Sequence, residues 1–249
     1  MNPEKSGKPA ATTTSAVLLA AGLSTRMASG RPEALRKPFL EIEGLTVLEH
    51  ACAAFDRVDA VREIVLVGHA DDRARLARMA ETCATMRKVR RIVAGGELRI
   101  YSVRSGVAAV DRACDLVAIH DAARPLIEPS IIERAIRCAA EHGAALVAIQ
   151  LADTVKTSSD GVHVESTLDR SVLWSAQTPQ VFRRELFESL LERARAENFQ
   201  PTDDSALHER WIGPVPIVTG SPHNLKVTTS EDLVLAAAIL RARQGARKP

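Results

Sequence analysis

The sequence predicts an α/β fold: a Rossmann-like, mostly parallel sheet with helices on both faces and a projecting β-hairpin arm. Short, nearly continuous apolar runs alternate with segments of helical periodicity, a pattern typical of strands buried on both faces. Aromatic residues make up only 3% of the 249 residues, so Ala, Val, Leu and Ile must fill the core. The alternation stops in a polar stretch at 152–182, which predicts the arm.

The apolar runs predict the strands, and the periodic segments predict the helices. The predicted strands are 16–21, 63–69, 89–96, 115–125 (running into a loop), 144–151 and 215–221. The predicted helices are 47–58, 71–83, 99–110, 129–143, 183–199, 203–211 and 229–244. Gly143 is expected to end its helix and Ser230 to cap the start of the last one.

The stretch TVKTSSDGVHVEST, at 154–167, predicts the hairpin of the arm. Its Asp160-Gly161 pair is a signal for a two-residue turn. A hairpin does not fit the middle of a parallel sheet, so we expect it to project, with the arm covering about 152–175.

Residues 15–243 are predicted to form a single domain, because no internal repeat or linker interrupts the pattern. Residues 1–14 are rich in Pro, Thr, Lys and Ser and are predicted to be a disordered tail. This tail lacks the apolar region of a signal peptide.

Composition narrows the classes of partner and compartment. The chain has 33 basic and 31 acidic residues, a net charge of +2, which gives no support for a nucleic-acid or membrane partner. No apolar run approaches the ~18 residues of a membrane span. The cysteines have neither C-x-x-C nor zinc-ligand spacing, so we expect free thiols and a cytoplasmic protein; they are Cys52, Cys83, Cys114 and Cys138.

Charged and small residues follow five of the predicted strands, at the edge where ligands of parallel sheets bind. Cations, hydroxyls and glycines that converge at one edge suit a polyphosphate. These residues are Gly22, Ser24, Thr25 and Arg26; Gly95, Gly96, Arg99 and Ser102; Asp121 and Arg124; Asp153, Thr154 and Lys156; and Asn224 and Lys226.

The loop after the first strand lacks both common phosphate-loop signatures. Neither G-x-x-x-x-G-K-[ST] nor G-x-G-x-x-G is present, which argues against a P-loop NTPase and a dinucleotide-binding fingerprint. Ala20, Ala21 and Gly22 instead allow a ligand to approach the backbone closely.

Six motifs occur together in one order: AVLLAAGLSTRM, Lys37 in RKPFLEIEG, GGELRIYSV, HDAARP, LDRSVLWSAQTPQVF and HNLKVTTSEDL. With these motifs the chain resembles the 2-C-methyl-D-erythritol 4-phosphate cytidylyltransferase family of isoprenoid precursor synthesis. The resemblance runs from about Ser15 to Leu240. It implies transfer of CMP from CTP to a sugar-alcohol phosphate, release of pyrophosphate and a requirement for Mg²⁺.

The resemblance also implies roles for particular residues. Arg26 and Lys37 match the pair that stabilises the transition state, and Arg170 and Lys226 match the pair that positions the acceptor phosphate. Substrate contacts are implied for Asp121, Arg124, Thr154 and Thr178, with Asp121 also able to orient Mg²⁺ or a ribose hydroxyl. The cytidine pocket and nucleotide contacts are implied for Ala20, Ala21, Gly22, Gly95, Gly96 and Ser102.

A homodimer is a further implication of the resemblance. In the family the arm embraces a second subunit, so Thr154 and Arg170 are expected to act at the dimer interface. Whether they serve their own subunit or its neighbour stays open.

Several of these residues also have structural interpretations. Asp121 either contacts substrate or caps a helix, and Arg124 either contacts substrate or forms an ion pair with Asp121 or Asp153. Asp203 and Asp204 either bind a metal or, the preferred interpretation, begin a helix.

One motif departs from the family pattern. Around the catalytic lysine, family members commonly carry Pro-Lys-Gln-Phe, whereas this chain has Arg36-Lys37-Pro38-Phe39. Arg36 offers an alternative cation, and the change leaves room for another acceptor such as ribitol 5-phosphate. A non-catalytic nucleotide-binding regulator is the second alternative, which is disfavoured because the chain retains Arg26, Lys37, Asp121, Arg170 and Lys226.

Overall fold

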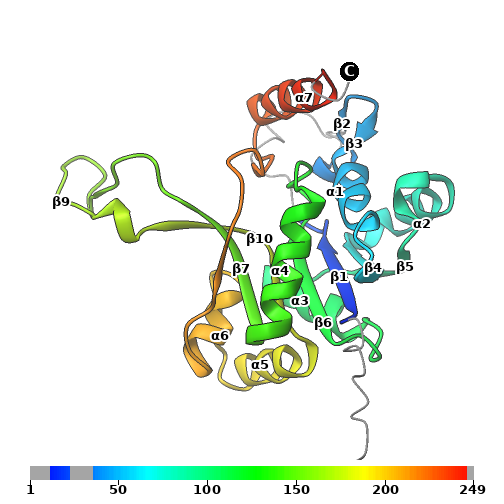
Figure 1. Ribbon diagram of the computed structural model, residues 1–249, viewed down its shortest axis with the longest axis horizontal. Coiled ribbons are helices and arrows are strands. Elements are labelled where there is room, and N and C mark those ends of the chain that lie inside the picture. The colour runs from blue at the N-terminus through cyan, green and yellow to red at the C-terminus, as the bar shows by residue number, and fades with distance from the viewer. Residues whose placement is uncertain (1–11, 23–35, 246–249) are drawn as a thin grey trace, which may run out of the picture.

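A central sheet of seven strands organises the computed structural model, which describes residues 12–22 and 36–245 (Figure 1). The strand order is β11-β7-β10-β6-β1-β4-β5. Within this sheet β10 is antiparallel to both neighbours, and the other adjacent pairs are parallel, as predicted. The bounds are β1 (Thr14–Leu19), β4 (Val61–Gly68), β5 (Val89–Ala94), β6 (Leu116–Asp121), β7 (Ala144–Gln150), β10 (Trp174–Arg183) and β11 (Ile217–Thr219).

Helices cover both faces of the sheet, which confirms the layered α/β prediction. They are α1 (Val47–Asp56), α2 (Arg73–Thr82), α3 (Arg99–Ala108), α4 (Pro129–His142), α5 (Arg184–Ala196), α6 (Ser205–Trp211) and α7 (Ser230–Gly245). The first face packs α1, α2 and α4 in one apolar cluster, and the second packs α3, α5 and α6 in another. Because both faces of the sheet are buried, its strands do not alternate apolar and polar residues. In β1, for example, Leu18 faces the first cluster and Val17 the second, and both are fully buried.

Short elements complete the edge of the sheet where the strands carry their carboxyl ends. They are η1 (Lys37–Phe39), the β2–β3 hairpin (Glu41–Ile42 and Leu45–Thr46) and η2 (Ala70–Asp72), whereas η3 (Ala84–Met86) directly precedes β5 and lies at the amino ends of the strands. α7 packs over this hairpin in a small cluster of its own around Ala236, Ile42 and Val47. This packing brings the segment that precedes α7 back to the same edge.

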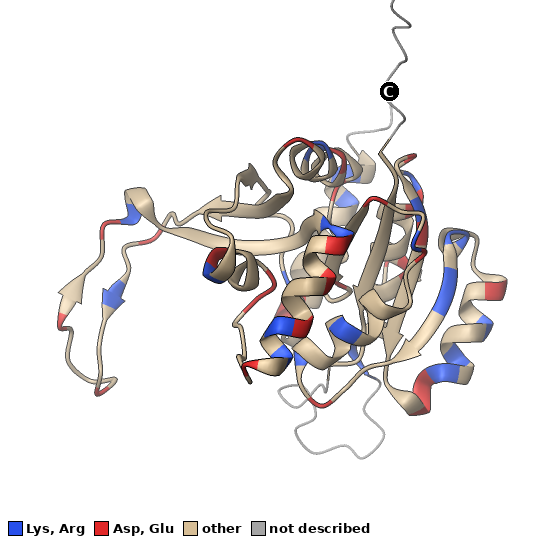
Figure 2. Ribbon diagram, turned by 90° about the horizontal axis from the view of Figure 1, so that it is seen from below, with Lys and Arg blue, Asp and Glu red and all other residues tan. Residues whose placement is uncertain are grey.

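The arm projects from the body of the molecule between β7 and β10 (Figures 1 and 2). It contains β8 (Lys156–Thr157) paired antiparallel with β9 (Ser166–Thr167), followed by η4 (Arg170–Val172). The predicted two-residue turn at Asp160-Gly161 is wrong, because the loop runs from 158 to 165. Asp160 Oδ1 organises that loop by accepting hydrogen bonds from the backbone N–H groups of Val162 and His163, at 2.8 Å each.

Sequence patterning missed β10, which lies inside the stretch assigned to the arm and its polar flank. The strand inserts antiparallel between β6 and β7, with Gln180 opposite Ile119 on one side and Leu146 on the other. Its amides and hydroxyl, Gln177, Thr178 and Gln180, are buried and hydrogen-bonded, so a buried strand here carries a polar sequence.

Two helix ends and one domain boundary can be compared with expectation. Gly143 ends α4 with φ +89°, as predicted. Ser230 is the first residue of α7 rather than its cap; Asp232 Oδ2 accepts hydrogen bonds from the N–H groups of Thr228 and Thr229 there. β1 begins at Thr14, the last residue of the predicted tail, and residues 1–11 lie outside the described residues.

The distribution of charged residues and the hydropathy of the described helices agree with the composition of the chain. Figure 2 shows basic and acidic residues interspersed along the ribbon. Within 12–22 and 36–245, none of the helices combines the length and apolarity that a membrane span requires.

Candidate active site

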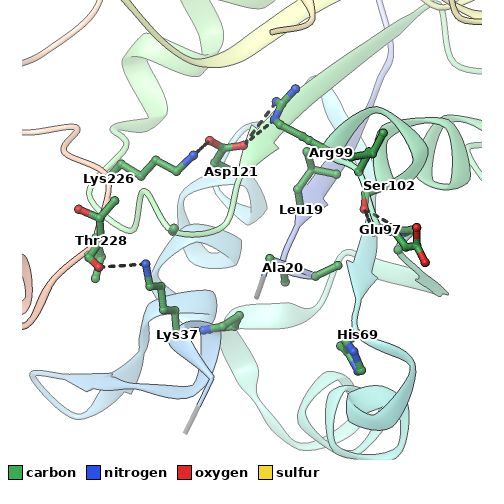
Figure 3. A pocket seen from close by; sticks show the side chains of 18 of the residues that line it. Leu19, Ala20, Lys37, His69, Glu97, Arg99, Ser102, Asp121, Lys226 and Thr228 are labelled. Atoms are coloured by element: carbon green, nitrogen blue, oxygen red, sulfur yellow. Dashed lines mark hydrogen bonds and ion pairs between the residues drawn. The ribbon is translucent and has the colours of Figure 1, made fainter. Parts of the chain in front are cut away.

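A cavity of about 520 Å³ lies at the carboxyl ends of β1, β4, β5 and β6, where the sequence predicted ligand binding (Figure 3). Six segments that are distant in sequence line it: Leu19–Gly22 at the end of β1, Lys37 and Pro38 of η1, His69 and Ala70 after β4, Gly95–Arg99 with Ser102 after β5, Asp121 and Ala123 at the end of β6, and Lys226–Thr228 before α7. The predicted nucleotide-binding residues and the two candidate lysines Lys37 and Lys226 thus share one cavity.

The first wall is built from backbone and small side chains. A Cβ added at Gly95 would lie 2.4 Å from Ala21 Cβ and 2.7 Å from Ser102 Oγ, so only glycine fits between these loops. The N–H of Gly96 donates a hydrogen bond to Ser102 Oγ at 3.1 Å. A Cβ at Gly22, in contrast, would meet none of the atoms of residues 12–22 and 36–245 within 4 Å. The wall is therefore closely packed behind and open toward the cavity, which suits a flat ligand.

Asp121, at the end of β6, is the centre of a group of charges on the side of the cavity opposite the glycine-lined wall. Lys226 Nζ lies 2.6 Å from its Oδ2, and Arg99 Nη2 lies 3.4 Å from its Oδ1, from the other direction (Figure 3). Burial by itself would raise the pKa of this carboxyl, but Arg99 and Lys226 together lower it to about 2. Asp121 is therefore a carboxylate held between two cations.

Lys37 reaches the cavity from η1. Its Nζ donates a hydrogen bond to the carbonyl oxygen of Thr228 at 3.0 Å. Pro38 occupies the first turn of η1, a position where proline costs no hydrogen bond. Arg36, the alternative cation, is instead bound by Asp72 at 2.6 Å and Asp71 at 3.1 Å. We infer that Lys37, and not Arg36, supplies charge to the cavity.

Arg124 and Thr178 support the site from behind. Arg124 donates hydrogen bonds to the carbonyl oxygens of Asn224 at 2.7 Å and Ala176 at 3.4 Å, instead of forming either ion pair considered from sequence. Burial lowers the pKa of Arg124. Thr178 Oγ1 accepts a hydrogen bond from the N–H of Asp121 at 3.1 Å and so holds the end of β6. Neither side chain lines the cavity.

The remaining predicted residues lie elsewhere. Thr154 and Arg170 are exposed on the arm, where Arg170 Nη1 donates to the carbonyl oxygen of Ala152 at 2.5 Å. Within this one chain they are not part of the cavity. Arg26 lies outside the described residues.

The sequence placed Arg99 among the residues at this edge but assigned it no specific role or partner, although its side chain links this site to the rest of the fold. It begins α3 directly after β5, and its guanidinium binds Asp121 and, more closely, Asp204. The available signal was its position after Gly95-Gly96, at the end of a predicted strand. The sequence does not show which carboxylates bind its guanidinium.

Comparisons with known proteins agree with this geometry. The family model "IspD: 2-C-methyl-D-erythritol 4-phosphate cytidylyltransferase" matches residues 14–242. The chain is 41% identical over 227 residues to the enzyme of that name from Caldanaerobacter subterraneus, covering 91% of this chain and 98% of the relative. It is 41% identical over 232 residues to the one from Acidobacterium capsulatum, covering 91% and 97%.

A solved structure shows the same fold. The crystal structure of 4-diphosphocytidyl-2C-methyl-D-erythritol synthase from Anaerococcus prevotii superposes with a TM-score of 0.80 at 32% identity, covering 93% of this chain and 97% of that one. The chain therefore belongs to the 2-C-methyl-D-erythritol 4-phosphate cytidylyltransferase family.

Proposed function

We propose that this chain transfers CMP from CTP to 2-C-methyl-D-erythritol 4-phosphate, giving 4-diphosphocytidyl-2-C-methyl-D-erythritol and pyrophosphate. The observation that carries the proposal is the convergence, in one cavity, of a glycine-lined wall with Lys37, Lys226 and the Arg99–Asp121 pair. Family membership supplies the identity of the two substrates.

The reaction joins two anions. A phosphate oxygen of the acceptor attacks the α-phosphorus of CTP in line; the new P–O bond forms as the bond to the β-phosphate oxygen breaks, and pyrophosphate leaves. Two like charges ~4 Å apart repel by about 4 kcal/mol near a protein surface. Fixed cations must offset this repulsion, and positioning and charge neutralisation are most of the catalysis in such transfers.

CTP is assigned to the glycine-lined wall. Its triphosphate would follow Ala20–Gly22, and its base would face Gly95, Gly96 and Ser102, where backbone groups would read the edge of a pyrimidine and a purine would be rejected by size. Lys37, anchored on Thr228, would neutralise charge at the α-phosphorus, and Arg26 is proposed as its partner in this role.

The acceptor is assigned to the Lys226 side. Lys226 is held 2.6 Å from Asp121, so its ammonium is oriented before substrate arrives and would bind the attacking phosphate. Thr154 and Arg170 are carried on an arm that projects from the body of the molecule (Figure 1), and neither residue lines the cavity of its own chain. We therefore propose a homodimer in which each arm completes the acceptor site of the other copy.

Mg²⁺ is proposed as the metal. Among the described residues there is no group of three metal-ligating side chains, and the cavity is lined by two carboxylates, Glu97 and Asp121. That donor set fits Mg²⁺, which commonly binds one or two carboxylates together with substrate phosphates. Asp121 is the proposed protein ligand. The ion would neutralise charge on the triphosphate.

The proposed compartment is the cytoplasm. All four cysteines are free thiols, as expected, and Cys52 and Cys114 are buried. Free thiols are typical of a reducing compartment.

The deciding experiment measures pyrophosphate release by the purified protein with CTP and Mg²⁺. Methylerythritol 4-phosphate and ribitol 5-phosphate are offered in parallel, with ATP, GTP and UTP as nucleotide controls and EDTA as the metal control. We expect release with CTP and methylerythritol phosphate, abolished by EDTA. Preference for ribitol phosphate would refute the proposed acceptor, and absence of release with either would refute the proposed transferase activity.

A further inference from the structure

Four charged side chains form a continuous chain of alternating sign from the buried start of α6 to the mouth of the cavity. In order they are Asp204, Arg99, Asp121 and Lys226. Only the last two belong to the acceptor site proposed above. The first is 4% exposed and does not line the cavity, so its carboxylate requires a separate explanation.

Asp204 is not used to cap α6, although it occupies the N-cap position. Its neighbour Asp203 caps the helix instead, because Asp203 Oδ1 accepts a hydrogen bond from the N–H of Ala206 at 3.1 Å. Asp203 also binds Gln180 Nε2 at 2.9 Å. The side chain of Asp204 makes no cap hydrogen bond within α6. The two adjacent carboxylates therefore have different tasks.

Both oxygens of Asp204 bind Arg99. Arg99 Nη1 lies 2.8 Å from Oδ1 and Nη2 lies 2.7 Å from Oδ2, a bidentate pair in which the carboxylate is buried and the guanidinium is partly exposed. The same guanidinium is 3.4 Å from Asp121. Arg99 is thus held principally by Asp204 and touches Asp121 at a longer distance.

We propose that Asp204 is a positioning residue for the acceptor-binding pair Asp121–Lys226, acting through Arg99. Asp204 holds Arg99 Nη2 at a distance of 3.4 Å from Asp121 Oδ1. Asp121 Oδ2 therefore stays available to orient Lys226, whose Nζ lies 2.6 Å away. If the charge of Asp204 is removed, Asp121 becomes the only carboxylate bound to Arg99 in this chain of charges. The guanidinium should then move onto Asp121 and compete with Lys226. This inference rests on the proposed function, because it gives Lys226 the acceptor phosphate.

The test compares Asp204→Asn with a matched control, Asp203→Asn. Both variants remove one carboxylate from the start of α6, but only the first loses the contact with Arg99. For Asp204→Asn we expect kcat/KM for the acceptor to fall about tenfold to a hundredfold, mostly through KM, as expected for a misplaced binding group. The dissociation constant of CTP should change less than threefold. Asp203→Asn is expected to lower the melting temperature by a similar amount but to leave acceptor KM within threefold.

A double-mutant cycle separates positioning from general damage. In a Lys226→Met background, Asp204→Asn should have no further effect on acceptor kcat/KM, since the pair it acts on is already broken. Additive losses would overturn the proposal. If Asp204→Asn does not fold, Arg99→Lys replaces it, because a lysine cannot reproduce the bidentate pair, and the same rise in acceptor KM is expected.

Crystal structures of both variants provide a readout independent of turnover. In Asp204→Asn the distance from Arg99 to Asp121 should shorten from 3.4 Å, and Lys226 should leave its position 2.6 Å from Oδ2. An unchanged arrangement would refute the inference. If the wild type shows no transfer at all, the proposed function fails, while this structural comparison still decides the role of Asp204.

Discussion

Asp121 offers the sharpest test of the electrostatics of this site. Asp121→Asn keeps the shape of the side chain and removes the negative charge between Arg99 and Lys226. The wild-type pKa is lowered from 3.8 to about 2, which corresponds to about 2 kcal/mol of stabilisation at 1.36 kcal/mol per pKa unit. The side chain is only 11% exposed, so solvent screens little of this energy.

The pH dependence of the effect has a definite sign. A carboxyl whose pKa is lower in the folded state stabilises the protein above its unfolded pKa and loses that contribution as pH falls through the folded value. The free energy of unfolding of Asp121→Asn should therefore lie about 2 kcal/mol below wild type at pH 7 and about 1 kcal/mol below it at pH 3. Acceptor kcat/KM should fall at least about tenfold, because Lys226 loses its anchor.

Urea unfolding at pH 7, 5 and 3 measures the difference, with the exposed Asp59→Asn as the control, for which we expect less than about 0.5 kcal/mol. A difference that stays constant from pH 7 to pH 3 would show that Asn disturbs packing instead of charge. A difference below about 0.5 kcal/mol at pH 7 would show that the two cations do not stabilise the carboxylate.

Three further predictions concern other parts of the site. Arg36→Ala releases the segment next to Lys37 from Asp72 and should lower kcat about tenfold in steady-state assays. The charge swap Arg36→Asp with Asp72→Arg should restore most of this activity. If activity is not restored, the ion pair does not position this segment. Gly95→Val places a Cβ 2.4 Å from the side chain of Ala21, so titration calorimetry should find that CTP binds at least about tenfold more weakly. An unchanged affinity would show that the cytosine base does not bind next to Gly95. Arg170→Ala and Lys226→Met should each be strongly impaired but measurable when assayed alone. Mixing the two proteins after subunit exchange should restore about a quarter of wild-type turnover if each arm serves the other copy, whereas no recovery would place Arg170 in its own subunit's site.

The alternation of strands and helices was readable from sequence because it depends on local periodicity. A strand buried on both faces must be apolar throughout, as in Leu116–Asp121 up to its last two residues, and a covering helix must be apolar on one side, as in Pro129–His142. The edge that binds ligands follows from the same pattern, because parallel strands place their carboxyl ends together. Gly95, Gly96, Ser102, Asp121 and Lys226 were found in this way.

β10 could not be read in the same way. Its residues are polar, and their burial depends on partners in other segments: Thr178 on the N–H of Asp121, Gln177 on the carbonyl oxygen of Ser221, and Gln180 on Asp203. A buried polar side chain is stable only when such partners exist, and no local pattern encodes them. The ion pairs considered as one alternative for Arg124 are not formed for the same reason, since its hydrogen-bond partners are the carbonyl oxygens of Asn224 and of Ala176 in β10.

The sequence by itself determined the fold class, the family and most of the cavity wall, because these depend on periodicity and on motifs of a few adjacent residues. Only the tertiary structure decided how the charges are distributed. Arg99 and Asp204 lie 105 residues apart, as do Asp121 and Lys226, yet their carboxylates and cations alternate within hydrogen-bond distances. Coulombic energy depends on separation in space and on burial, and both arise only when the sheet has brought these segments to one edge.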